Sequence, residues 1–386
     1  MTRLTAALVA STALLWCGFS VAQTALADDQ ELRAAIDHLG DFDYDTRTAA
    51  SSFVRRVPVE QGGPALAAAV IGHEDGYVRF RAMVLLVGFG GPMAKQAVLE
   101  VLDDPNDRLR AVAYGYFEHE PDPAMARALL QALDTETSEF VRPALIRAVA
   151  AHDGDPLVRE RLVADVDRGV DFFRGGVIEA LGDRRASYAL DALMRVVAEP
   201  GPLQDDALLA LTRIGDTRAL AAVAALQGTD AEMEPMVSAA AAALGSDRDR
   251  HFQFVIESLR YAAAGEELDL VRSAAAGLGA LAASGDAEAV QALFDVGVDA
   301  GVGPRDAIAL VVGMLAMRDP AVLLAHLETR SDLPEAALVL RDGFDILDED
   351  LEEERFFMSA RTAFWAASEG ARSRVVTEEL IRVLEF

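Results

Sequence analysis

Residues 172–197 read FFRGGVIEALGDRRASYALDALMRVV, and their apolar residues predict two short helices joined by a turn. From Phe173 to Leu181 an apolar residue recurs at every fourth position, as on one face of a helix. Gly182 then interrupts the pattern, because glycine adopts the left-handed conformation that ends many helices. A second apolar series follows: Ala189, Leu190, Leu193, Val196 and Val197. Neither helix buries its apolar face alone, so we expect further helix pairs on both sides.

The start of the first helix of this pair recurs along the chain and carries an arginine. The recurring positions are Arg79, Arg110, Arg142, Arg174, Arg272 and Arg305, at steps of 31 to 34 residues, with Asp206 and Ser238 where the arginine is missing. A fixed period of about 20–50 residues with one helix pair per period is typical of an α-solenoid. The sequence therefore predicts an all-α fold, in which roughly ten helix pairs stack into a superhelix between helical caps.

Aspartates at the expected starts of the second helices give the same register. The sites are Asp122, Asp155 and Asp319, each followed by proline, and Asp216 and Asp286, which lack it. Aspartate is a favoured N-cap and proline a favoured first helical residue. The steps from Asp122 to Asp155 and from Asp286 to Asp319 are both 33 residues, close to the arginine spacing. Two separate sequence marks thus indicate one repeat.

The repeat itself resembles a known family. The segments VRFRAMVLLVG (78–88) and VRSAAAGLGAL (271–281) are similar to HEAT repeats, and most of all to the HEAT-like repeats of phycobilisome lyases. The resemblance covers residues 45–330. It implies a superhelix whose concave surface is lined by the second helices and binds proteins. It also implies that the repeat arginines are structural and bond to acids or turn carbonyls of adjacent repeats.

Four segments follow from these patterns. Residues 1–27 are a predicted signal peptide, residues 28–44 a capping helix, residues 45–330 the repeats, and residues 331–386 divergent helices that cap the other end. Solenoids need terminal repeats with a polar outer face, which suits both ends. Within the last segment, DILDEDLEEER (345–355) is strongly acidic, and a run of like charges is usually solvated. We therefore expect this run to face solvent.

The N-terminus predicts export. Met1–Arg3 is short and positive, Leu4–Ala22 is apolar, and Ala25–Ala27 has the small residues of a cleavage site. Cleavage would remove Cys17, the only cysteine, and leave no disulfide and no thiolate metal ligand. We expect a periplasmic or secreted bacterial protein with no membrane span after cleavage. If the segment is retained, the chain is instead a membrane-tethered envelope assembly factor.

Composition restricts the partners. The formal net charge is −28, and Lys95 is the only lysine. Nucleic acid binding needs a cationic face, so a nucleic acid partner is not expected. Hydrophobic residues make up 52% of the chain but aromatics only 6%, which predicts a core of small aliphatic side chains that allow helices to approach closely.

Two histidines are the candidate metal ligands. His119 and His152 lie 33 residues apart at nearly equivalent turn positions, beside the acids Glu118, Glu120 and Asp153. Together they could hold a divalent cation on one edge of the solenoid. The alternative, which we prefer, is that they are polar turn residues, because their spacing fixes no ligand geometry. We therefore predict no metal and no cofactor.

No catalytic residues are predicted either. The sequence has no Gly-x-Ser-x-Gly motif, no Ser-His-Asp order and no cysteine nucleophile after signal cleavage. The interpretation that follows is a non-catalytic scaffold that binds a protein partner on its concave surface. An enzyme or chromophore lyase on the same solenoid is the alternative that the family resemblance allows. An exposed apolar strip along the groove would favour the scaffold, and a deep pocket with converging polar residues would favour an enzyme.

Overall fold

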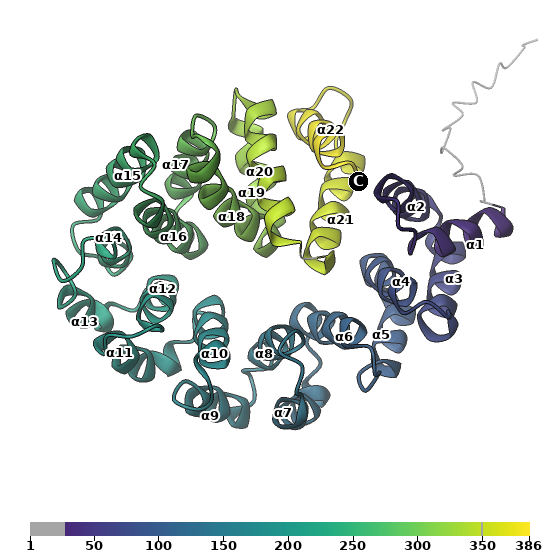
Figure 1. The fold of residues 1–386 in the computed structure, drawn as a ribbon, viewed down its shortest axis with the longest axis horizontal. Coiled ribbons are helices and arrows are strands. Elements are labelled where there is room, and N and C mark those ends of the chain that lie inside the picture. The colour runs from purple at the N-terminus through teal and green to yellow at the C-terminus, as the bar shows by residue number, and fades with distance from the viewer. Residues whose placement is uncertain (1–27, 349) are drawn as a thin grey trace, which may run out of the picture.

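The computed structural model describes residues 28–348 and 350–386, and this part of the chain is helical throughout. It contains 22 α-helices and three short 3₁₀ helices, and no strand occurs among the described residues. The helices stack side by side in two rows that curve into a ring (Figure 1). The all-α solenoid is thereby confirmed. The predicted signal peptide, with its cysteine, lies outside the described residues.

The inner row consists of α4 (Gly76–Phe89), α6 (Asp107–His119), α8 (Arg142–Ala151), α10 (Asp171–Asp183), α12 (Gln204–Ile214), α14 (Glu234–Ala243), α16 (Leu268–Ser284), α18 (Val302–Arg318) and α20 (Leu333–Leu347). The outer row consists of α5 (Gly91–Glu100), α7 (Ala126–Thr135), α9 (Pro156–Asp165), α11 (Leu190–Ala198), α13 (Leu220–Ala224), α15 (Arg248–Gly265), α17 (Ala287–Gly297) and α19 (Pro320–Thr329). The ends are α1 (Asp29–His38), α2 (Tyr44–Arg56), α3 (Val59–Gly72), α21 (Asp350–Ala366) and α22 (Arg372–Leu384). The 3₁₀ helices are Pro123–Met125, Ser187–Ala189 and Thr217–Ala219.

The helices that start at the repeat arginines form the inner row, so the expectation that the second helices line the concave surface is wrong (Figure 1). Inner and outer helices differ in how much of their surface is apolar, and this difference decides which row a helix joins. An inner helix contacts the inner helices before and after it as well as an outer partner, and in α14 every residue from 235 to 242 is buried. An outer helix needs a single apolar stripe, and in α11 Asp191 and Arg195 remain exposed.

Gly182 has a different role from the one predicted. Helix α10 continues past it to Asp183, and the left-handed residue beyond the helix is Arg185, with a φ of 51°. A Cβ atom at Gly182 would lie 2.7 Å from the Cα of Ala210 in α12. The glycine therefore permits close approach of two inner helices rather than ending one of them.

The predicted N-caps are confirmed. The carboxylate of Asp155 accepts a hydrogen bond from the backbone N–H of Leu157 at 2.9 Å, and that of Asp319 accepts one from Val322 at 3.1 Å. Asp286 does the same at the start of α17, while Asp122 and Asp216 cap the 3₁₀ turns that lead into α7 and α13. These bonds are local, which is why the sequence predicts them.

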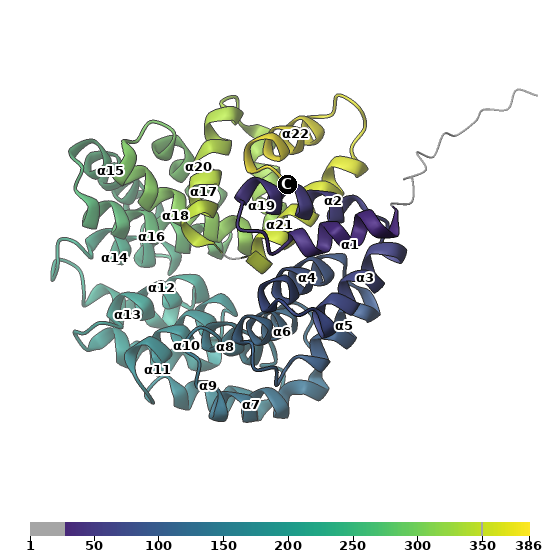
Figure 2. The same ribbon diagram turned by 45° about the vertical axis from the view of Figure 1, so that its right-hand side comes forward.

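The two ends of the solenoid meet. Helix α21 lies against α4, and α22 covers the end of the rows beside α19 and α20 (Figures 1 and 2). Across the ring, Arg318 of α18 forms an ion pair with Asp183 of α10. The concave surface is thus the inside of a closed ring and not an open groove.

Among the described helices, none is by itself long and apolar enough to cross a membrane. Helices α18 and α19 reach that length and composition only when taken together, and they bend by 119° where they join.

Candidate functional site on the concave surface

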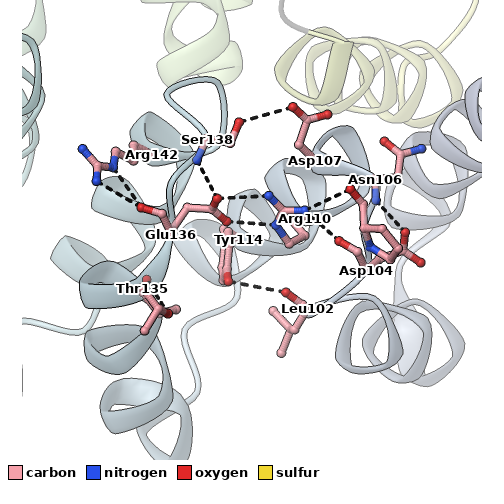
Figure 3. Close-up of polar contacts among 12 residues, drawn as sticks. Leu102, Asp104, Asn106, Asp107, Arg110, Tyr114, Thr135, Glu136, Ser138 and Arg142 are labelled. Carbon is pink, nitrogen blue, oxygen red and sulfur yellow. Dashed lines mark hydrogen bonds and ion pairs between the residues drawn. The ribbon is translucent and has the colours of Figure 1, made fainter.

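The repeat arginines tie consecutive repeats together. Arg110 donates from Nε and from a terminal nitrogen to the carboxylate of Glu136, at 2.9 and 3.0 Å, and from its other terminal nitrogen to the carbonyl of Asp104 at 2.7 Å (Figure 3). The carbonyl of Glu136 in turn accepts two bonds from Arg142 at 3.1 Å. Burial raises the pKa of Glu136, but the bonds from Arg110 and from the backbone N–H of Ser138 outweigh it and hold the pKa below its usual value. One turn therefore anchors two successive inner helices.

Two more arginines make similar links. Arg79 donates to the carbonyl of Val70 at 2.7 Å and pairs with Asp104, and Arg174 donates to the carbonyl of Val166 at 2.8 Å. Arg305 also joins two repeats, but it pairs with Asp342 inside α20, the next inner helix, at 2.6 Å. Guanidinium suits this position because it presents several donors in a fixed plane.

Arg272 does not follow the predicted structural role. Its guanidinium pairs with Asp269 of its own helix at 2.8 Å, and its side chain is 64% exposed. The preceding helix, α15, is 18 residues long and leaves only Glu266 and Glu267 before α16. This connection is too short to form the turn whose carbonyls and acids hold Arg79, Arg110 and Arg142. Arg272 instead faces the inside of the ring.

The later part of the acidic run closes the ring, so the expectation that the run faces solvent is wrong there and holds only at its start, where Asp345 and Asp348 are exposed. Glu354 is 1% exposed and accepts two bonds from the Nε of Arg55, at 2.8 and 3.0 Å, and one from a terminal nitrogen of Arg55 at 2.6 Å. Asp350 forms an ion pair with Arg81 of α4. Glu354 is buried and Asp350 partly buried because α2 and α4 present arginines to them. This part of the run is therefore a contact surface between the two ends of the solenoid.

The two candidate metal ligands have separate partners. His119 faces Glu352 and Arg355 of α21, each at 2.8 Å from its Nε2. His152 is buried, and its ring nitrogens contact the backbone of Ala148 and Asp122 at 2.7 and 3.1 Å. The metal-binding edge suggested by the sequence is therefore not formed, because α21 engages the first histidine and a turn engages the second.

A different cluster, Glu118, His119 and Glu352, brings three ligand atoms within 4.8 Å of one another. Arg147 pairs with Glu118 at 2.9 Å, and Arg355 pairs with Glu352 at 2.9 Å. Both carboxylates are thus already neutralised by guanidinium groups. The cluster is an ion-pair network that fastens α21 to α6.

The concave surface carries an apolar hollow of about 360 Å³ between α10 and α12 on one side and α16 and α18 on the other. Its apolar lining consists mainly of Leu209, Ala276, Leu310, Val311, Met314 and Leu315. Met314 is 39% exposed, and its neighbours in the lining are half-buried. We call this surface the apolar hollow.

Charged groups border the apolar hollow without converging on one point. Glu179 and Asp206 form no ion pair within the described part of the chain, and burial raises the pKa of both carboxyl groups although Arg213 opposes the shift. The side chain of Glu179 is exposed to solvent inside the ring, but the surrounding helices still desolvate its carboxyl group. Arg213 pairs with Asp183 at 3.1 Å. Among these groups no nucleophile is placed beside a base, so the hollow matches an apolar strip better than a catalytic pocket.

A second hollow, of about 400 Å³, lies between α4, α6, α8 and α10 and the adjoining ends of α20 and α21. Phe140 and Phe172 line it and are 57% and 61% exposed. Each precedes a repeat arginine by two residues. Arg108 has the same place in α6, and its guanidinium lies 5.4 Å from the ring centre of Phe80, 5.7 Å from that of Tyr77 and 5.9 Å from that of Phe140. We call this surface the aromatic hollow.

Residues 63–150 match the family model of HEAT repeats. This segment belongs to the HEAT-repeat family. The matched segment runs from α3 to α8, and the same pairing of an outer with an inner helix continues to α20. No curated protein matches the chain in sequence.

Several solved structures are similar to this HEAT-repeat protein. The complex of CpcE and CpcF of phycocyanin lyase from Nostoc sp. PCC7120 matches with 19% identity over 58% of this chain and 91% of that chain, at a TM-score of 0.35. A complex of Kap95p with RanGDP matches with 10% identity over 93% of this chain and 61% of that chain, at a TM-score of 0.42. Kap121p matches with 12% identity over 93% of this chain and 46% of that chain, at a TM-score of 0.31. The HEAT-repeat protein thus spans less than two thirds of both karyopherin chains.

Sequence reasoning missed both hollows of this HEAT-repeat protein. The aromatic hollow has a periodic signal, since the residues two before the repeat arginines are Tyr77, Arg108, Phe140 and Phe172. The apolar hollow has none, because its two walls come from helices separated by more than 50 residues of sequence.

Proposed function

We propose that this HEAT-repeat protein is an exported, non-catalytic scaffold that binds a segment of a protein partner on its concave surface. The observation that carries the proposal is the apolar hollow, where six apolar side chains remain accessible on the inside of the ring. Apolar surface that stays accessible in a folded protein is typical of an interaction site. Export is supported by the predicted signal peptide.

The size of the apolar hollow favours a segment over a whole domain. About 360 Å³ accommodates a few side chains of a peptide or loop. Contacts between α21 and α4 close the ring, which restricts the entry of a folded domain. The dispersed charges around the hollow support a binding role, because catalysis requires groups aligned on one reacting atom.

Site-specific photocrosslinking in the native host tests the proposal. A photoreactive amino acid replaces Met314 in the apolar hollow, and in a matched control it replaces Leu99, which is 45% exposed on outer helix α5. We expect one protein to be linked from the first position and not from the second, and mass spectrometry identifies it. Equal crosslinking from both positions, or none from Met314, would contradict binding at this surface.

Export has its own measurement. The intact mass of the protein purified from its host should correspond to a chain that begins at Asp28. A mass that includes residues 1–27 would instead favour the tethered assembly factor.

A further inference from the structure

We propose that the aromatic hollow binds an arginine side chain of a basic segment of the partner, with its guanidinium between the rings of Phe140 and Phe172. This inference rests on the proposed scaffold function and names the chemistry of the partner. It concerns a second surface, separate from the apolar hollow, so the two can fail independently.

The chain itself provides the precedent. Arg108 occupies the same position of its repeat as Phe140 and Phe172, and its guanidinium lies within 6 Å of three aromatic ring centres. That distance is the range of a cation–π interaction. Arg108 therefore shows that a guanidinium can lie over aromatic rings at the starts of these inner helices.

The next interval along the row runs from Phe140 to Phe172; both rings are exposed, and Arg108 approaches Phe140 from the preceding interval. Arg142, the nearest repeat arginine, lies 5.8 Å from the ring centre of Phe173, and its guanidinium bonds to the carbonyl of Glu136. Packed helices are about 8–10 Å apart. Phe140 and Phe172 stand at the starts of two such neighbouring helices, and both rings line the aromatic hollow. A guest guanidinium that enters the hollow therefore meets both exposed rings.

Charge in the hollow favours a cation. Glu139 and Asp348 line it and form no ion pair within the described part of the chain. The arginines that line it are already engaged, Arg108 with aromatic rings and Arg147 with Glu118. The chain as a whole carries −28, which attracts a basic segment over longer distances.

Arginine is favoured over lysine at this position. Guanidinium is planar, stacks on aromatic faces and is less strongly hydrated than ammonium. Carboxylates beside the rings also match its several donors. The volume of about 400 Å³ exceeds what one guanidinium requires, so backbone and flanking side chains of a peptide also fit.

The test uses the purified full chain and two synthetic nine-residue peptides that differ only in carrying three arginines or three lysines. Fluorescence anisotropy measures the affinity for each peptide at low and at physiological salt. We expect the arginine peptide to bind more tightly. Phe140→Ala and Phe172→Ala should each weaken its binding by about fivefold to thirtyfold, the range of a partly desolvated cation–π contact. Both rings are more than half exposed, so each variant should change the Tm only slightly.

Phe42→Ala is the matched control, because Phe42 is fully exposed and lies outside both hollows. It should leave both affinities unchanged. Glu139→Gln should weaken both peptides, because it removes charge but no ring. Equal affinity for the two peptides, with no effect of either Phe variant, would mean attraction by net charge alone and would overturn the inference. If arginine amide alone binds as tightly as the arginine peptide, the site recognises a free guanidinium compound, and the assignment to a protein segment is wrong.

The crosslinking experiment separates the two proposals. If Met314 still captures its partner while the Phe variants change nothing, only the arginine site is wrong. If the Phe variants weaken the peptide while Met314 captures nothing, the apolar hollow is not the binding surface and the arginine site stands alone.

Discussion

The guanidinium of Arg55 and the carboxylate of Glu354 form a buried ion pair between residues 299 positions apart in the sequence. The side chains are 7% and 1% exposed, and three donor–acceptor distances lie between 2.6 and 3.0 Å. One residue belongs to α2 and the other to α21, so the pair joins the first repeats to the last. Closure of the ring therefore depends on a specific contact between its ends.

Removing one partner of this pair should open the ring. Glu354→Ala leaves Arg55 buried without its counter-charge, which costs about 3–5 kcal/mol. We expect a loss of that size in urea unfolding and faster amide hydrogen exchange in α21.

The double variant Arg55→Met with Glu354→Leu is the control, because apolar replacement of both partners is often neutral. It should recover most of the stability. If the single variant unfolds like the parent, the pair does not hold the ring closed.

The contact between α6 and α21 should depend on pH through Glu352. Burial raises the pKa of this carboxyl group, but the hydrogen bond from His119 and the charges of His119, Arg355 and Arg147 outweigh it and hold the pKa below the usual value. Its ionised form is therefore favoured in the folded protein. The resulting stability is fully present above the ordinary pKa of a glutamate and is lost as pH falls through the lower, folded-state pKa.

Glu352→Gln tests this dependence. Unfolding free energies of the parent and the variant should differ near neutral pH and converge in acid, below the ordinary glutamate range. A difference that stays constant down to strongly acidic pH would show that the charge of Glu352 is not what stabilises the contact.

Arg110 and Arg272 occupy the same position of the repeat but make different contacts, so their contributions to stability should differ. Arg110→Ala leaves the buried carboxylate of Glu136 without its charged donor and should cost about 1.5–3 kcal/mol. Arg272→Ala removes an exposed pair within one helix and should cost less than about 0.5 kcal/mol. Thermal unfolding of the two variants measures the contrast, and similar Tm losses would mean that the turn contact of Arg110 contributes little.

The local part of the fold is predictable from the sequence, and the closure of the ring is not. An N-cap such as Asp155 acts over two residues, and the repeat register is set by neighbours about 32 positions apart. Closure depends on small rotations that accumulate over every repeat. It places Glu354 beside Arg55, and nothing in the acidic run distinguishes that outcome from a solvated surface.

The assignment of helices to the inner row was also within reach of the sequence. The segment PMVSAAAA at 235–242 is apolar on all sides, whereas the next helix, from Arg248 to Gly265, has one apolar stripe. A helix without a polar face must be covered on several sides. The resemblance to HEAT repeats predicts the opposite assignment because it concerns the order of the helices and not their faces.

The crossing of α18 and α20 should be the position least tolerant of a larger side chain. A Cβ atom at Gly343 would fall on the carbonyl oxygen of Ala309, and one at Gly313 would lie 3.1 Å from the backbone of Gly343. Backbone atoms cannot rotate away as a side chain can, so Gly343→Ala forces the helices apart and should cost about 1–3 kcal/mol.

Gly72→Ala is the control, because a Cβ there meets nothing within 4 Å and the residue is helical. It should be neutral or slightly stabilising, since alanine favours the helix. Equal Tm values for the two variants would show that the helices do not cross as closely as these glycines imply.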